Sequence, residues 1–154
     1  MTFFDWLEGS GVAVLMRQLP LLYPVIEIIH ILGIVFVVGS AMLFDLRLLG
    51  VAKKIPVSSL AKLLLTWSRR GLWLVIPSGL LLFSSDAVSL IQNPVFISKL
   101  FLILLAFGNA VFFHFSTYRN HKDWEGGRKA KGAAIISMIL WISIISCGRL
   151  IAYF

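Results

Sequence analysis

Long apolar stretches separated by short polar connections run along the whole chain. Four mainly apolar windows, at 21–44, 60–83, 95–117 and 132–152, have the roughly 20 residues that a helix needs to cross the hydrocarbon core of a bilayer. A chain segment in lipid must satisfy its own backbone polar groups, so these windows should be helical. The pattern therefore predicts an all-α, integral membrane four-helix bundle in which residues 1–154 form a single four-span domain.

The segment before the first window has a different pattern, in which apolar and charged residues share one short amphipathic stretch. Thr2 and Asp5 have the spacing of a helix capping box. Amphipathic helices of this kind lie in the membrane interface. We expect an N-terminal interfacial helix at about 2–18, which Pro20 and Pro24 end before the first span begins.

Proline also interrupts the second window. Pro77 is followed by Ser78 and Gly79 in the middle of an apolar run. A proline inside a helix removes one backbone hydrogen bond and bends the helix. We expect a kink whose freed carbonyl finds a partner inside the bundle.

Composition supports the membrane assignment and limits where chemistry can occur. Hydrophobic residues make up 59% of the chain and charged residues 14%, whereas a soluble domain is about a quarter charged. Four spans with short connections use nearly the whole length. No soluble catalytic domain fits, so any chemistry must lie between the helices.

The net charge of +7 comes from basic residues that are sorted by connection. Eleven of the fourteen form two groups: Arg47, Lys53, Lys54, Lys62, Arg69 and Arg70 between the end of the first span and the first half of the second window, and Arg119, Lys122, Arg128, Lys129 and Lys131 after the third. The positive-inside rule puts both connections in the cytoplasm. We therefore expect a bacterial inner membrane protein with both termini on the outer, periplasmic side. Because the basic residues do not form a face interleaved with aromatics, no nucleic-acid partner is expected.

Five ionisable residues inside the predicted spans stand out as candidates for a functional site, because charged groups are costly there: Glu27, His30, Lys99, His114 and Arg149. From a rise of about 1.5 Å per residue, Glu27 and His30 lie roughly 8 and 12 Å below the outer boundary. Lys99 and Arg149 lie about 5 Å below it. His114 lies deep, roughly 28 Å below the same boundary.

The four outer residues together with Gly33 suggest a pocket for an anionic planar ligand such as haem b. His30 is the predicted iron ligand, and Lys99 and Arg149 would pair with the propionates. Glu27 would orient the imidazole, and Gly33, one turn deeper, would provide a flat patch. The alternatives are a hydrogen-bonded structural histidine and cations that extend to the lipid head groups.

His114 does not fit the same pocket. It differs from His30 in depth by about 15 Å, too far for both rings to bind one iron. We include it as a further cofactor candidate because it could serve a second, inner site. The other residues that could form such a site are Asp45, Arg47, Met42 and Met138. Otherwise His114 hydrogen-bonds near the membrane surface.

Several strings resemble a bacterial four-helix inner-membrane family of unknown function. They are Tyr23-Pro24-Val25-Ile26-Glu27-Ile28-Ile29-His30-Ile31-Leu32-Gly33, Asp45-Leu46-Arg47-Leu48-Leu49-Gly50, Asn93-Pro94 with Lys99, and the closing Gly148-Arg149-Leu150-Ile151-Ala152-Tyr153-Phe154. This resemblance covers the full length of the chain and implies the four-span topology.

A more distant similarity is to HemJ-type protoporphyrinogen oxidases and to CopD-like copper-resistance membrane proteins. The HemJ pattern would be carried here by His30, Gly39, Arg47, Lys99 and His114. The resemblance implies haem binding at His30. The tryptophan-glycine and leucine-proline-arginine strings of that family are replaced by Val38-Gly39 and Phe44-Asp45-Leu46-Arg47.

The leading hypothesis is a b-type haem-binding membrane protein with an electron-transfer or redox role. One alternative is a HemJ-like porphyrinogen oxidase, so whether the protein is an oxidoreductase enzyme stays open. Another is a copper-handling protein, although Met1, Met16, Met42, Met138 and the single Cys147 are scattered. The last is a structural accessory subunit. Small residues on the helices would permit a homo-oligomer or assembly into a membrane complex.

Overall fold

A computed structural model of the chain describes residues 2–115 and 127–154. The described residues are helical apart from short turns. The elements are α1 (Phe3–Glu8), α2 (Gly11–Gln18), α3 (Leu22–Leu49), α4 (Val57–Ser85), α5 (Ala87–Gln92), α6 (Pro94–Phe113), α7 (Arg128–Leu150) and the 3₁₀ turn η2 (Ile151–Tyr153).

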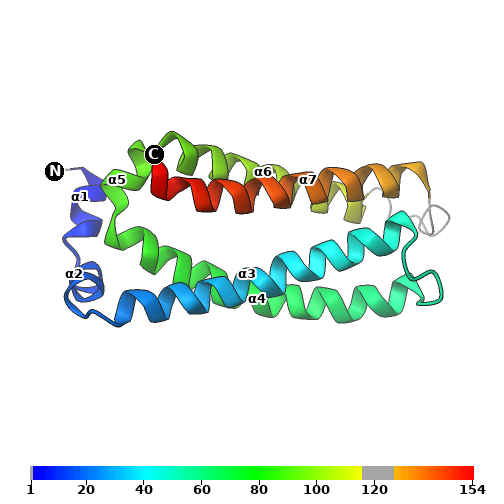
Figure 1. The fold of residues 1–154 in the computed structure, drawn as a ribbon, viewed down its shortest axis with the longest axis horizontal. Coiled ribbons are helices and arrows are strands. Elements are labelled where there is room, and N and C mark those ends of the chain that lie inside the picture. Colours follow the sequence, from blue (N-terminus) through cyan, green and yellow to red (C-terminus); the bar gives the residue numbers. More distant parts are fainter. Residues whose placement is uncertain (1, 116–126) are drawn as a thin grey trace.

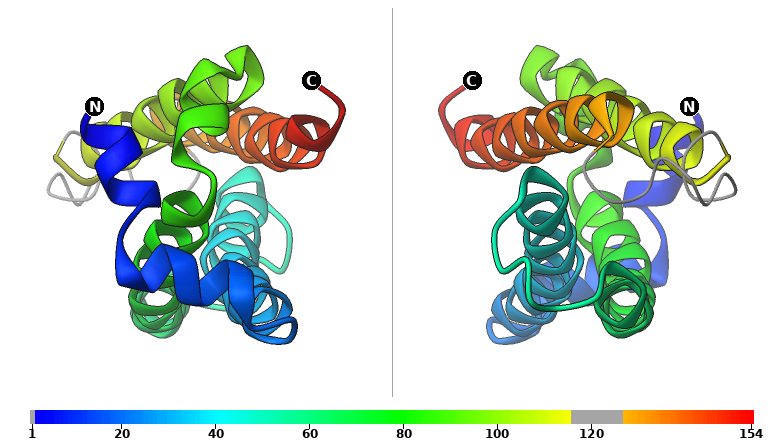
Figure 2. Two further views of the ribbon diagram at one scale, coloured as in Figure 1. Left: turned by 90° about the vertical axis from the view of Figure 1, so that its left-hand side faces the viewer. Right: turned by 90° about the vertical axis from the view of Figure 1, so that its right-hand side faces the viewer.

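The four long helices form two pairs. Helix α3 packs along α4, α6 packs along α7, and contacts between α3 and α7 join the pairs. Figure 1 shows the pairs as two layers, and Figure 2, along the long axis, shows α6 and α7 lying over α3 and α4. Helices α1, α2 and α5 and the C-terminus gather at one end of the molecule, opposite the turn at 50–56.

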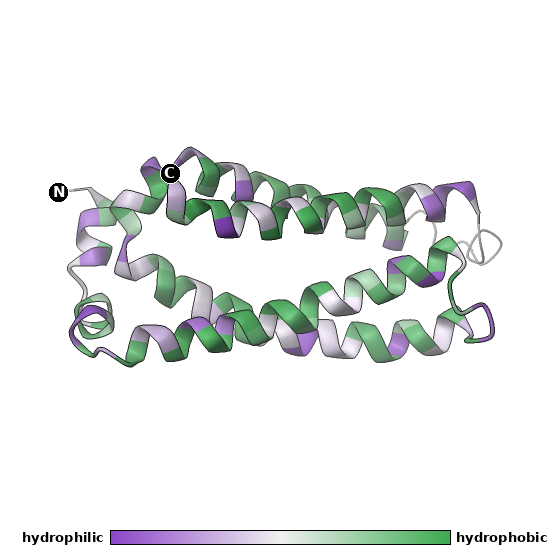
Figure 3. Ribbon diagram, in the orientation of Figure 1, coloured by the Kyte–Doolittle hydropathy of each residue, from purple (hydrophilic) through white to green (hydrophobic). Residues whose placement is uncertain are grey.

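Three helices are long and apolar enough to cross a membrane: Leu22–Leu49, Pro94–Phe113 and Arg128–Tyr153. Figure 3 shows apolar residues along these helices and polar residues concentrated toward the ends. Helix α4 covers the predicted second span and is 29 residues long, but it is not among the three. Arg69 and Arg70 lie near its middle and divide its apolar residues into shorter runs.

The long helices overlap the four predicted windows, and the described helix ends differ from the window ends by up to five residues. Pro24 lies in the first turn of α3, where its missing N–H is tolerated. Helix α6 ends at Phe113, and the predicted end of that span at 117 lies outside the described residues. Helix α7 begins at Arg128, four residues before the predicted span. Gly50 ends α3 in a left-handed conformation with φ 109°, which favours glycine.

The prediction of one helix at 2–18 is wrong in one respect, because the segment forms two helices. The capping box at Thr2 and Asp5 is present at the start of α1. Gly9 then ends α1, and the Ser10 hydroxyl accepts a hydrogen bond from the Ala13 N–H to start α2. A second N-cap so soon after the first breaks the helix.

Two charged residues attach these short helices to the ends of α4 and α5. The Arg17 guanidinium donates to the Ser85 carbonyl at 2.8 Å and to the Glu8 carbonyl at 2.6 Å. A Glu8 carboxylate oxygen accepts from the Val88 N–H at 3.1 Å. Arg17 thus satisfies a carbonyl in the last turn of α4, where helices leave carbonyls unpaired.

Helices α3 and α4 approach most closely where two glycines face each other. A Cβ on Gly33 would lie 2.7 Å from Val75 Cγ2, and one on Gly71 would lie 2.8 Å from the Gly33 carbonyl oxygen. Small residues allow such approaches, and close packing drives helix association in lipid. At the other end, a buried apolar cluster joins both pairs, formed by Leu48, Val57, Ala130 and Ala134.

Candidate functional site

A cavity of about 700 Å³ lies between the helices, at the end of the molecule where α5 is followed by α6. We call it the Arg149 cavity. Its volume is within the range of about 300–1,000 Å³ that is typical of ligand sites. It is lined by Tyr23, Glu27, Leu82, Asp86, Ser89, Leu90, Gln92, Asn93, Gly148, Arg149, Ile151, Ala152 and Phe154. Two of the predicted site residues, Glu27 and Arg149, therefore share one cavity although 122 positions separate them in the printed sequence.

Lys99 reaches α7 beside this cavity. Its Nζ atom lies 3.6 Å from the position that a Cβ on Gly148 would occupy, so it lies over a glycine of the cavity wall. The guanidinium of Arg149 lies 5.7 Å from the centre of the Tyr153 ring. The two predicted cations thus come from α6 and α7 to the same region.

His30 lies against α4 at the proline of that helix. Its Nδ1 atom is 3.1 Å from the Val75 carbonyl oxygen and 3.0 Å from Ser78 Oγ. A Cβ on Gly79 would lie 3.0 Å from Cε1 of the ring, so Gly79 provides the space for the imidazole. Ser78 donates to the carbonyls of Leu74 and Val75.

These contacts fix the tautomer of His30. A carbonyl can only accept, so the hydrogen between His30 and Val75 must be on Nδ1. The Nε2 atom then carries the lone pair. Among the hydrogen bonds of the described residues, His30 uses only Nδ1. This is the arrangement of metal-binding histidines, in which the ring nitrogen that does not bind metal donates to a carbonyl or carboxylate.

Gly33 lies one turn from His30, but it is buried between α3 and α4. Val75, Leu74 and Gly71 surround the place where its side chain would begin. Close packing of α3 against α4 therefore explains why a glycine is needed at position 33, and no ligand has to be invoked. Its role as a flat patch beside a cofactor stays a prediction.

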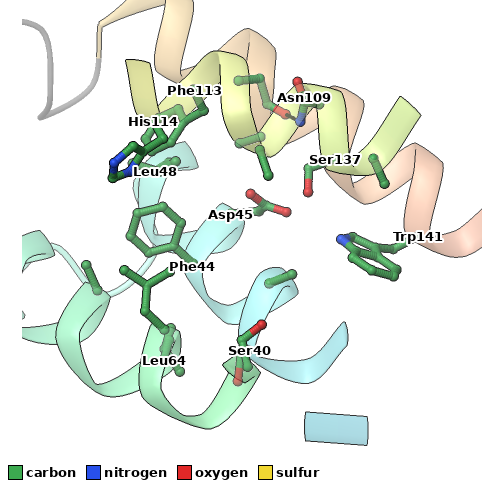
Figure 4. A pocket seen from close by; sticks show the side chains of 18 residues that line it. Ser40, Phe44, Asp45, Leu48, Leu64, Asn109, Phe113, His114, Ser137 and Trp141 are labelled. Atoms are coloured by element: carbon green, nitrogen blue, oxygen red, sulfur yellow. Dashed lines mark hydrogen bonds between the residues drawn. The ribbon is translucent and has the colours of Figure 1, made fainter. Parts of the chain in front are cut away.

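His114 lines a different cavity, of about 210 Å³, between α3, α4, α6 and α7. We call it the Asp45 cavity. Figure 4 shows Asp45 of α3 facing Ser137 of α7. The sequence suggested Asp45, Arg47, Met42 and Met138 as possible companions of His114. Asp45 alone of these lines the cavity, whereas Arg47 donates to the carbonyls of Ile55 and Lys53 in the turn after α3.

Sequence reasoning did not find the partners of His30 on α4, and it gave Asp45 only a secondary place. The signal for the first was partial, because Pro77 predicts a freed carbonyl four residues earlier, at Trp73, whereas His30 contacts the Val75 carbonyl. The signal for the second was an acidic residue beside an apolar span. Nothing in the pattern indicated that Asp45 is only 6% exposed. No cluster of three or more His, Cys, Asp or Glu side chains suited to a metal ion occurs within residues 2–115 and 127–154.

Comparison with known proteins gives a family but no activity. No curated protein and no solved structure matches the chain significantly. The similarity to HemJ-type and CopD-like proteins therefore stays an expectation from the sequence. A family model described as a family of unknown function, DUF6644, matches residues 3–154. The match covers nearly the whole chain, and the protein belongs to this DUF6644 family.

Proposed function

We propose that the protein crosses a bacterial inner membrane four times and binds haem b with His30 as an iron ligand, in an electron-transfer or redox role. The lipid bilayer is the environment that its three long apolar helices suggest. Both termini would face the periplasm. Gly108, exposed on α6 with nothing within 4 Å of its Cβ position, would allow another helix to approach in a homo-oligomer or larger complex.

The fourth crossing would be α4. Its 29 residues correspond to a length of about 43 Å, enough to span the hydrocarbon core. Arg69 and Arg70 would then extend along the helix toward the cytoplasmic head groups. The Arg70 guanidinium already lies 5.1 Å from the centre of the Trp67 ring, one turn toward that end. If both α4 and α6 cross the membrane, the two basic connections lie on the same side of it.

The observation that carries the haem proposal is the hydrogen bond between His30 Nδ1 and the Val75 carbonyl. It orients the ring and leaves Nε2 with its lone pair for a metal. Ser78 beside the same Nδ1 strengthens the anchor from the same turn of α4. His30 is half-buried, so water has limited access to the ring.

The charged residues would recognise the carboxylates of the cofactor. Arg149 lines the cavity and Lys99 lies over Gly148 in its wall, which puts two cations from different helices near one opening. Charge-assisted hydrogen bonds to carboxylates are stronger than neutral ones. Glu27, also in the wall, would orient the ligand by repelling its carboxylates from the α3 side.

Haem b, when bound, supplies a one-electron couple between two oxidation states of iron. The chain would contribute a neutral imidazole, a carbonyl that raises its basicity, and low-dielectric surroundings. These are the ways in which a protein tunes a haem.

The visible spectrum of the detergent-purified chain, expressed with haem available, tests the proposal. We expect a Soret band with reducible α and β bands in the wild type, and its loss in His30→Ala. His114→Ala is the matched control and should keep the band, because His114 lines the Asp45 cavity, which His30 does not. Gly79→Ala should shift or weaken it, since the added Cβ would meet the ring of His30 at 3.0 Å.

Two results would contradict the proposal. One is a folded wild-type protein that takes up no haem when titrated with it. The other is a band that survives His30→Ala but disappears in His114→Ala.

A further inference from the structure

The Asp45 cavity contains a buried acidic group with an unsatisfied oxygen. Asp45 is 6% exposed, and its Oδ2 atom has no hydrogen-bond partner in the part of the chain that the structure describes. An ionised carboxylate is strongly disfavoured in apolar surroundings unless a cation or hydrogen-bond donors accompany it. Asp45 lines the cavity, so a ligand bound there lies beside this carboxyl group and can supply the missing partner.

The lysines and arginines that the structure describes do not fill this role. Arg47 donates from Nε to the Ile55 carbonyl at 2.8 Å and from Nη2 to the Lys53 carbonyl at 3.3 Å, so it is committed to the turn. The described residues that line the cavity include no Lys or Arg, and His114 is the other ionisable one. Asn109 on α6 donates to the Ala133 carbonyl at 3.0 Å.

The remaining walls suit an organic cation better than a metal ion. Three aromatic rings line the cavity, from Phe44, Phe113 and Trp141. Aromatic faces attract ammonium groups and also bury alkyl groups. Ser137, facing the carboxyl from α7, adds one hydroxyl (Figure 4). Of the side chains that usually bind metal ions, the described walls contain only Asp45 and His114, and no cluster of three or more His, Cys, Asp or Glu occurs among the described residues.

We infer that the Asp45 cavity is a binding site for a small organic ammonium ion, with Asp45 as its counter-ion and the three rings around its alkyl groups. The volume of about 210 Å³ equals the share of about seven water molecules in the liquid, so the ligand has only a few heavy atoms. This site is separate from the Arg149 cavity and does not depend on haem binding.

The experiment is a calorimetric titration of the full chain in nanodiscs with tetramethylammonium and with n-butylammonium chloride. We expect both ions to bind the wild type, and n-butanol, which has the alkyl chain without the charge, to bind far more weakly. Asp45→Asn keeps the shape and removes the charge, and it should weaken binding by roughly 100-fold. Asp5→Asn removes an equivalent charge from the distant helix α1 and should leave binding unchanged.

A second measurement keeps the test decisive if Asp45→Asn folds poorly. Trp141→Leu retains an apolar side chain but removes a ring, and it should weaken tetramethylammonium binding about tenfold. Infrared difference spectra should also show that adding the amine removes any carbonyl band of a protonated Asp45.

Amine binding unaffected by both substitutions would overturn the inference. So would equally strong binding of n-butanol, or an Asp45 band that persists at saturating amine. The Soret band reports on His30 in the same samples, so failure of either proposal is seen separately.

Discussion

At Gly33 and Gly71, α3 and α4 are so close that neither position has room for a Cβ. A Cβ on Gly71 would lie 2.8 Å from the Gly33 carbonyl oxygen and 2.8 Å from Phe36 Cβ. Neither atom is at the end of a flexible side chain that could rotate away. The close contact between these helices therefore requires glycine at both positions.

Gly71→Ala should lower the free energy of unfolding by about 1–3 kcal/mol, the usual cost of forcing an extra methyl group into a packed interface. Denaturation of the purified protein in mixed micelles, followed by circular dichroism, measures the change. Gly39→Ala in α3 is the control, because nothing lies within 4 Å of its Cβ position. Equal effects of the two substitutions would show that the close approach does not stabilise the fold.

Individual residues also show where local patterns can mislead. His30 and Gly33 lie on one helix three positions apart, and both were predicted to face a ligand. The structure puts the Gly33 backbone against Gly71 and the His30 ring against Gly79. Both residues contact α4, but of the two only His30 has a side-chain atom, Nε2, with a lone pair that could bind a ligand.

Among the elements, the short helices α1 and α2 are held at one end of the molecule by specific polar contacts. Arg17 makes two of these contacts through one guanidinium, to Ser85 of α4 and Glu8 of α1. Ala13 and Met16 of α2 are buried, so the contacts also position an apolar face. We expect this segment to open locally before the long helices separate.

Arg17→Met retains most of the aliphatic length and removes both hydrogen bonds. Each was made by a charged donor, so the local opening free energy of α1 and α2 should fall by about 1–3 kcal/mol. Amide hydrogen exchange in these two helices measures it, while exchange in α6 and α7 should stay as it is. Lys54→Met serves as the control, because it removes the same charge from an exposed position in the turn after α3. Unchanged exchange in Arg17→Met would refute the role of the guanidinium.

For the whole molecule, the question of three or four crossings has a direct consequence for which side each connection faces. Lys54 in the turn after α3 and Ser89 in α5 lie at opposite ends of the molecule (Figure 1). If α4 crosses the membrane, these two residues face opposite compartments. If α4 does not cross, they face the same one.

Cysteine labelling distinguishes the two cases. In a Cys147→Ser background, an impermeant maleimide added to intact spheroplasts should label Ser89→Cys and Thr2→Cys. Lys54→Cys should react only after the membrane is permeabilised, as the positive-inside rule requires. Labelling of Lys54→Cys and Ser89→Cys from the same side would eliminate the four-span topology. All three positions are exposed, so access to the reagent depends on the membrane alone.

The sequence by itself determined the helices and their ends. Long apolar runs predict helices in lipid, and Pro24 and Asn93-Pro94 mark helix starts by local backbone chemistry that needs no distant partner. The capping box at Thr2 was readable for the same reason. The break at Gly9 and Ser10 was a local signal too, but the continuous amphipathic pattern concealed it.

Only the tertiary structure decided which helix faces meet. A helix that is apolar on nearly every side gives no indication of which side packs against protein and which against lipid. For that reason the pairing of His30 with Val75 and Ser78 could not be derived from spacing. The burial of Asp45 in a cavity formed by four helices could not be derived either, because both depend on contacts between segments far apart in the chain.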